Sequence, residues 1–125
     1  MDLGGYFDRT KGRGVLATAD ASGKVNAAVY SRPYFTDETT AVFIMAERLT
    51  HENTKTNPYA IYLFMEAGEG YTGKRIYLKK IKEEMNEQLA GNICRKCDYS
   101  HYNVDKAFVV SFTVEKILPL VGSGT

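Results

Sequence analysis

The residues best placed for chemistry lie together where an apolar strand gives way to a short helix. This stretch runs from Ala46 to Pro58, between the apolar runs TAVFIM and AIYLFM. Thr50 is the predicted N-cap of the helix, because its hydroxyl can accept a hydrogen bond from a first-turn N–H group. Asn57 is the predicted end, since a residue before proline avoids the α region. Free N–H groups, a hydroxyl and the guanidinium of Arg48 could together bind a phosphate, and an ordinary capped helix between two strands is the alternative.

A second group of residues has the spacing of half a metal site. Cys94-x-x-Cys97 is followed by His101 in a polar stretch of the chain. Tetrahedral zinc needs four ligands, so Asp98 or a partner chain would have to complete the site. A thioredoxin-type role is disfavoured, because the pair does not open a helix after a strand. Bystander cysteines and a metal or redox pair therefore both stay open, and we assign no metal ligand.

Composition restricts the class of protein. The 125 residues are 44% hydrophobic and 25% charged, which predicts one globular domain over residues 1–125. The net charge is +1, from 16 basic and 15 acidic residues, and gives no electrostatic reason for a nucleic-acid or anionic-membrane partner. The first residues lack the apolar core of a signal peptide. Two cysteines without a disulfide framework then favour a reducing cytoplasm.

The rest of the chain reads mainly as strands. Alternating and continuous apolar patterns separated by turn residues predict a closed or nearly closed antiparallel barrel. A short helix is expected near Asp2–Lys11, and the stripe Ile81, Met85 and Leu89 predicts another helix that ends at Gly91. The six predicted strands are Val15–Ala19, Lys24–Phe35, Thr40–Ala46, Ala60–Met65, Gly73–Ile81 and Ala107–Leu118.

Two of these strands indicate a partner. Thr40–Ala46 and Ala60–Met65 do not alternate, and an unbroken apolar run predicts burial on both faces of the sheet. A single small barrel buries only the inner face. We therefore expect a second copy of the chain to cover the outer faces, which makes the protein a homodimer.

Three segments together resemble the flavin-binding split-barrel family, which includes pyridoxamine 5′-phosphate oxidase and small bacterial FMN-binding proteins. They read GVLATADASGKVNAAVYSRPYF, TAVFIMAERLTHENTKTNPYAIYLF and GYTGKRIYL, within residues 14–82. The signal is their order: strand, turn, basic and hydroxyl-bearing helix start, Asn-Pro, apolar strand. The resemblance implies a mainly β fold, a six-stranded antiparallel split β-barrel with short helices, which binds FMN non-covalently near the interface of a homodimer.

The resemblance also implies which residues bind the cofactor. The main chain of the second strand would lie along the flavin ring, where small side chains allow close approach. Arginines and the helix start would bind the phosphate, and Asn53 would bond the ring or the ribitol. A cation from the strand Gly73–Ile81, Lys74 or Arg75, would reach the cofactor from the other subunit. The predicted cofactor-binding residues are Asn26, Ala27, Ala28, Val29, Arg32, Arg48, Leu49, Thr50, Asn53 and Lys74.

The same resemblance limits the activity. The closing segment LPLVG contains no Arg or His of the kind that grips the vitamin substrate in the true oxidase. We therefore expect a flavin-dependent oxidoreductase or a flavin electron carrier, with a small-molecule redox substrate or an electron-transfer partner, and we name no catalytic side chain. His51 could donate a proton or tune the flavin, but a solvated helix histidine is the favoured interpretation.

Two alternatives from other classes stay open. One is a non-catalytic binding module on the same barrel that takes a deazaflavin, a haem or no ligand. The other is a small-barrel binder of single-stranded nucleic acid that uses Tyr with Lys and Arg, against which the balanced charge argues.

Overall fold

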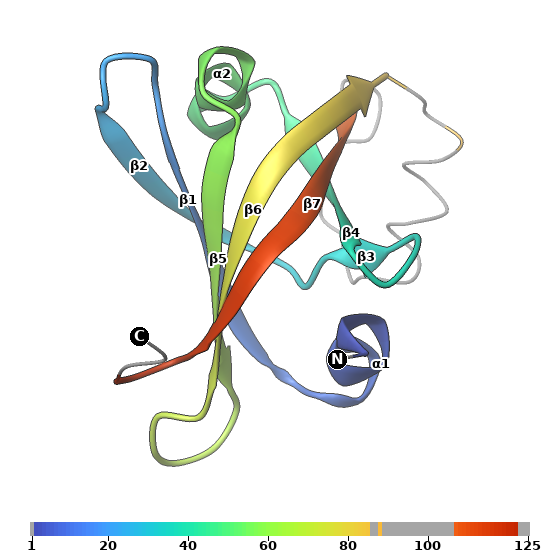
Figure 1. The fold of residues 1–125 in the computed structure, drawn as a ribbon, viewed down its shortest axis with the longest axis vertical. Helices are drawn as coiled ribbons and strands as arrows, with labels where there is room; N and C mark the ends of the chain where they lie inside the picture. Colours follow the sequence, from blue (N-terminus) through green and yellow to red (C-terminus); the bar gives the residue numbers. More distant parts are fainter. Residues whose placement is uncertain (1, 86–87, 89–106, 123–125) are drawn as a thin grey trace.

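A computed structural model describes residues 2–85, 88 and 107–122 of the chain. Within these residues, seven strands and two helices make up the molecule (Figure 1). The helices are α1 (Leu3–Arg9) and α2 (Leu49–Thr56). The strands are β1 (Gly12–Ala19), β2 (Val25–Tyr30), β3 (Tyr34–Phe35), β4 (Thr40–Ala46), β5 (Tyr59–Glu66), β6 (Gly73–Glu84) and β7 (Ala107–Pro119).

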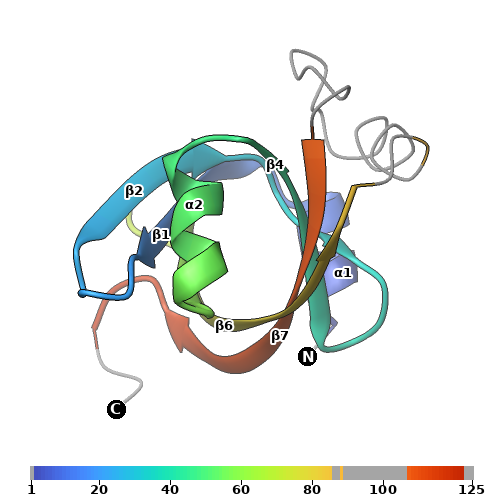
Figure 2. The same ribbon diagram turned by 90° about the horizontal axis from the view of Figure 1, so that it is seen from above.

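All seven strands belong to one antiparallel sheet that curls into a barrel. The order across the sheet is β2-β1-β5-β6-β7-β4-β3, so β2 and β3 are its two edges. Seen from above, the strands form a ring with α2 across its mouth (Figure 2). The mainly β antiparallel barrel predicted from the sequence is confirmed, although it is not closed and has a seventh strand, the two-residue β3.

Alternation along the strands produces the core. In β5, Ala60, Tyr62 and Phe64 point inward and are buried, while the residues between them are partly exposed. The expected burial on both faces is therefore confirmed for β4, where all of Ala41–Met45 is buried. In β5 one chain buries only the inner face, so the expected burial of its outer face by a second copy stays a prediction.

Two predicted boundaries were wrong for local reasons. The predicted helix over Ile81–Gly91 begins instead as strand, because β6 continues to Glu84 and pairs with β7 as far as Val109. The later part of that predicted helix, with Leu89 and Gly91, lies outside the described residues. The predicted strand Lys24–Phe35 is divided into β2 and β3 at Pro33, which cannot donate a ladder hydrogen bond.

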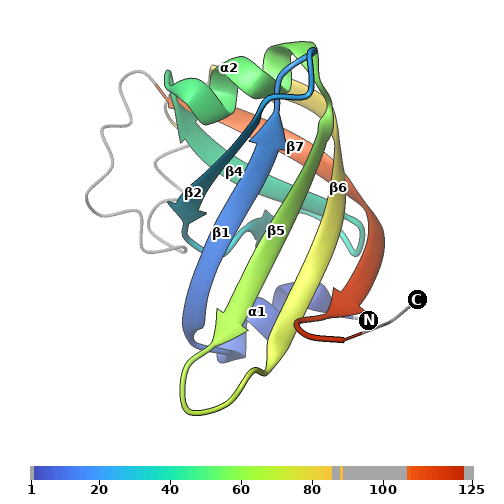
Figure 3. The same ribbon diagram turned by 90° about the vertical axis from the view of Figure 1, so that its left-hand side faces the viewer.

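Helix α1 covers one end of the barrel (Figure 3). Its residues Leu3, Tyr6 and Phe7 are buried in the core, and the short helix expected near Asp2–Lys11 is confirmed. Asp2 caps the helix by accepting a hydrogen bond from the Gly5 N–H at 3.0 Å. A Cβ on Gly5 would lie 2.3 Å from the Asp2 carboxylate, so glycine leaves room for this cap. Among the described residues, neither helix has the length and apolar character needed to cross a membrane.

Candidate functional site

Helix α2 lies across the other end of the barrel, opposite α1 (Figure 3). The helix begins at Leu49, and the N-cap is Arg48, whose side chain makes no capping hydrogen bond. The prediction of Thr50 as N-cap was therefore wrong: Thr50 is in the first turn, and its side chain points into the barrel and is buried. The predicted C-terminal end at Asn57 is confirmed.

The buried face of α2 is bonded to the first two strands. The Asn26 side chain on β2 donates a hydrogen bond from Nδ2 to Thr50 Oγ1 at 3.2 Å. Asn53 Nδ2 donates to Thr18 Oγ1 on β1 at 3.1 Å, and both groups are buried. The first turn of the helix is thus fixed to the strand at the open edge of the sheet.

His51 joins the same helix to β6 and β7. Its side chain is fully buried and stacks on Phe108, with ring centroids 3.9 Å apart. Its Nε2 lies 3.0 Å from the carboxylate of Glu83, which also pairs with Lys80. The expectation of a solvated histidine was wrong, because the sequence did not show that β6 would extend far enough to place Glu83 beside α2.

The charge on Glu83 is stabilised by these neighbours. Burial alone would raise the pKa of the Glu83 carboxyl, but hydrogen bonds from Lys80 and His51 outweigh burial and hold it below its ordinary value. Lys80 also donates from Nζ to the carbonyl of Thr54 at 3.3 Å. The set formed by His51, Glu83 and Lys80 therefore holds the orientation of α2 and, with it, the direction of its first N–H groups.

The solvent side of this region offers an open strand edge beside a cationic helix start. Arg48 and Leu49 are exposed. On β2, Ala27 and Val29 point outward and are exposed, while Asn26 and Ala28 are partly buried. Among the described strands, β2 pairs with β1 alone, so backbone groups of Asn26–Val29 on its other side could contact a ligand.

Two predicted site residues lie elsewhere in the chain. Arg32 follows β2 and donates from Nη1 to the carbonyls of Phe7 and Thr10, at 2.9 and 3.0 Å, at the end of α1. Arg32 is six positions along the chain from Asn26, a span of at most roughly 20 Å if the chain were fully extended. Lys74 lies on β6, with its ammonium 4.7 Å from the Tyr6 ring centroid.

One chain therefore brings together β2 and the helix start, but not Arg32 or Lys74. Asn53 belongs to the same end as the helix start, where its side chain is occupied by Thr18. The sequence analysis missed Thr18 as the partner of Asn53. The available signal was that Thr18 lies two residues after the inward-facing Leu16 on the same strand. A polar side chain on that buried face needs a partner.

The predicted half-site of Cys94, Cys97 and His101 lies outside the described residues. Within the part of the chain that the structure describes, no group of three or more His, Cys, Asp or Glu side chains is arranged to hold a metal ion.

Comparison with solved structures identifies the fold. An FMN-binding protein from Syntrophomonas wolfei superposes with a TM-score of 0.80, at 19% identity over 98% of this chain and 86% of that protein. An F420 reductase gives 0.75, at 12% identity over 90% of this chain and 94% of the other. The heme storage protein HutZ from Vibrio cholerae gives 0.68, at 13% identity over 92% and 90%.

Pyridoxamine 5′-phosphate oxidase-like proteins share the same architecture. No protein-family model matches the sequence, and no curated protein matches it. At identities this low the superposition establishes the fold alone: the chain has the split-barrel fold of FMN-binding, oxidase-like proteins.

Proposed function

We propose that this protein binds FMN non-covalently and acts as a flavin-dependent oxidoreductase or flavin electron carrier. The observation that carries the proposal is the hydrogen bond from Asn26 to Thr50, which fixes the open edge strand β2 to the first turn of α2. A strand edge for a flat ring and a helix start for a phosphate are thereby held in one rigid unit.

The helix start supplies the groups that a phosphate needs. An FMN phosphate carries about −1.5 to −2 charges at neutral pH. That charge would be stabilised by the exposed Arg48 guanidinium, by the N–H groups of Leu49 and Thr50 and by the positive end of the helix dipole. The Thr50 hydroxyl accepts from Asn26, which sets the distance between strand and helix.

The edge strand supplies the position for the ring. In the proposed site the isoalloxazine lies along the main chain of Asn26–Val29, where Ala27 and Ala28 allow close approach. FMN, when bound, would supply the redox chemistry. The residues of this chain would bind the phosphate, orient the ring and, through His51 and Glu83, keep α2 in place.

A homodimer is part of the same proposal. The outward-facing residues of β2, β1, β5 and β6, here called the outer face, form rows across the sheet: Val29, Val15 and Leu63 in one row, and Ala27, Ala17, Ile61 and Tyr77 in the next. Val29 is 80% exposed in one chain. A second copy on this face would bury the rows and cover the ring, and Lys74 could contact the cofactor only from such a second subunit.

The test is a titration of the purified protein with FMN, followed by flavin absorbance and fluorescence. Arg48→Ala should weaken binding about tenfold or more, because a charge-assisted hydrogen bond contributes roughly 1.5–3 kcal/mol. Lys55→Ala removes the same charge from the other end of α2, where Lys55 pairs with Glu52, and should leave the affinity unchanged. Absence of a flavin band and of micromolar binding in the wild-type protein would overturn the proposal.

The alternative of another planar ligand is supported by two of the structural neighbours. One is an F420 reductase and one a heme storage protein. A deazaflavin has the same tricyclic shape and a phosphate, so it would use the same strand and helix start. The absorption spectrum and mass of the ligand that co-purifies distinguish FMN, deazaflavin and haem. We also propose that the protein is located in the cytoplasm.

A further inference from the structure

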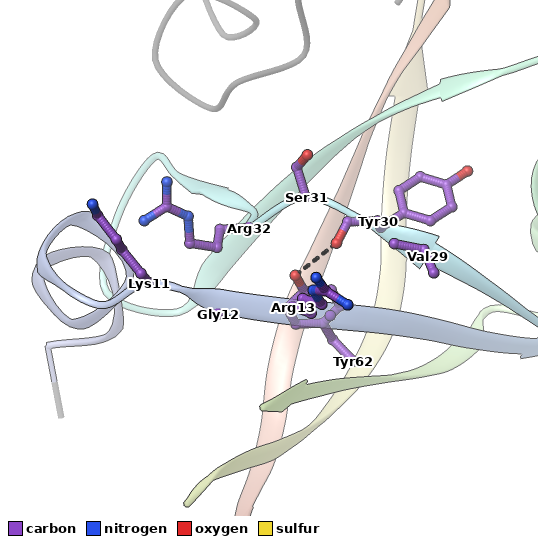
Figure 4. A pocket seen from close by; sticks show the side chains of 9 residues that line it. Lys11, Gly12, Arg13, Val29, Tyr30, Ser31, Arg32 and Tyr62 are labelled. Carbon is purple, nitrogen blue, oxygen red and sulfur yellow. Dashed lines mark hydrogen bonds between the residues drawn. The ribbon is translucent and has the colours of Figure 1, made fainter. Parts of the chain in front are cut away.

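A basic hollow lies where β1 and β2 separate, near the α1 end of the barrel (Figure 4). Its volume is about 300 Å³. Of the described residues that line it, three are cations, Lys11, Arg13 and Arg32, and none is acidic. Val29, which lines the hollow, is three positions along β2 from Asn26, the residue bonded to the helix start, a length of roughly 10 Å.

The backbone at the hollow is open on one side. The ladder between β1 and β2 ends at the Gly14–Tyr30 pair, whereas the ladder between β1 and β5 continues to Gly12. Among the described strands, none pairs with Gly12 and Arg13 on the side of the hollow, so this edge of β1 faces it. Backbone N–H groups at such an edge can donate hydrogen bonds to a ligand.

The floor of the hollow is fixed by a buried tyrosine. Tyr62 donates a hydrogen bond from its hydroxyl to the Tyr30 carbonyl at 3.0 Å, passing under Gly14. A Cβ on Gly14 would lie 2.0 Å from the Tyr62 hydroxyl, so only glycine permits this contact. The floor therefore keeps the two strands at a set separation just where the hollow opens.

One wall of the hollow is equally fixed. The Arg32 guanidinium is held by the carbonyls of Phe7 and Thr10 at the end of α1. Lys11 and Arg13, in contrast, are exposed, and Figure 4 shows Lys11 projecting to the same side as Arg32. Bringing like charges together is unfavourable unless an anion lies among them.

We propose that the basic hollow binds the oxyanion group of a small molecule, a phosphate ester or a carboxylate, at the end of β2 away from the helix start proposed for the FMN phosphate. Lys11 and Arg13 supply charge-assisted hydrogen bonds, and the free edge of β1 supplies N–H groups. The inference does not depend on FMN binding.

The experiment is a titration of ¹⁵N-labelled protein with inorganic phosphate at constant ionic strength, followed by amide chemical shifts. Saturable shifts are expected at Gly12, Arg13, Gly14 and Ser31. The double variant Lys11→Gln/Arg13→Gln should weaken phosphate binding at least about tenfold, since each lost contact is charge-assisted. Lys82→Gln, which removes an exposed cation from β6, should leave it unchanged, and Arg13→Lys should retain most of it.

Further arms identify the ligand chemistry and keep the proposal separate from that of FMN. Acetate in place of phosphate tests whether the hollow accepts a carboxylate. The solution mass of each variant shows whether its oligomeric state is unchanged. Saturating FMN should leave the phosphate shifts in place. Displacement of phosphate by FMN, shifts that do not saturate, or equal binding by the double variant would overturn the inference.

Discussion

The polar side chains on the buried face of α2 contact four different strands, three of them through hydrogen bonds. Thr50 contacts β2, Asn53 contacts β1, and His51 reaches β6 through Glu83 and β7 through Phe108. An eight-residue helix is too short to be stable alone. These individual contacts therefore determine whether the helix start is available as a binding site.

The hydrogen bond between Asn53 and Thr18 provides a first prediction. Thr18→Val leaves the buried Asn53 amide without its acceptor and should lower the free energy of unfolding by about 1–3 kcal/mol. The double variant Thr18→Val/Asn53→Leu removes both polar groups and should recover part of the loss. Urea unfolding of the two single variants and the double variant measures the coupling. Strictly additive effects would contradict a direct bond.

The pair of Glu83 and His51 provides a second prediction. Because the folded-state pKa of Glu83 lies below the ordinary value of 4.5, its contribution to stability is present above that value and is lost as the pH falls through the folded-state pKa. Glu83→Gln should lower stability at neutral pH and should lack this part of the acid-induced loss.

Urea unfolding at neutral pH and at a pH of about 3 checks this sign. Glu84→Gln is the matched control, since Glu84 is the next residue of β6 and is exposed. If Glu83→Gln lost as much stability on acidification as the wild-type protein, the ion pair would not be the cause.

At the scale of elements, α1 is held on the barrel by an arginine that follows β2 in the sequence. Arg32 bonds two carbonyls at the end of α1, and such carbonyls have no partners within a helix. Arg32→Ala should therefore increase hydrogen exchange in α1 before it affects the central strands. Arg13→Ala, which removes an exposed arginine of β1, should leave the protection of α1 unchanged. Equal protection of α1 in the wild-type protein and Arg32→Ala would contradict this role.

The elements show what sequence patterns can predict. The barrel strands follow from period-two patterns and turn residues, and Pro33 marks the break between β2 and β3. The stripe Ile81 and Met85 predicted a helix, but pairing of β6 with β7 decided the local structure instead. The pattern along β1 indicated that Thr18 needs a partner, but the residues that bond Thr18 and His51 could not be predicted, because the pairing depends on register between strands distant in sequence.

The candidate site shows the same limit. The helix start and β2 were predicted from local pattern and from family resemblance, and the structure places them together. Arg32 was predicted beside the phosphate, yet it caps α1 in this chain, because the path of the chain after Tyr30 turns toward the opposite end of the barrel. The hollow at Lys11 and Arg13 was missed, although cations alternating with glycines in KGRG were a local signal.

At the scale of the whole molecule, the two ends of the barrel are covered and one face is not. Helices α1 and α2 bury the ends, whereas the outer face leaves Val25 and Val29 each 80% exposed. Contiguous apolar surface of this kind marks an interaction site in soluble proteins. Loss of the proposed dimer, which would expose this face, should therefore lower both stability and cofactor binding.

Ile61 lies in the row Ala27, Ala17, Ile61 and Tyr77 and tests the dimer most directly. We expect the wild-type protein to sediment as a dimer at micromolar concentration and Ile61→Glu to sediment as a monomer, because a symmetric interface would bury one unpaired carboxylate from each copy. Tyr71→Glu adds the same charge at an 80% exposed position in the turn between β5 and β6 and should remain dimeric. If the outer face also covers the flavin ring, Ile61→Glu should weaken FMN binding while leaving the Asn26–Thr50 bond intact. A dimeric Ile61→Glu would place the interface elsewhere on the molecule.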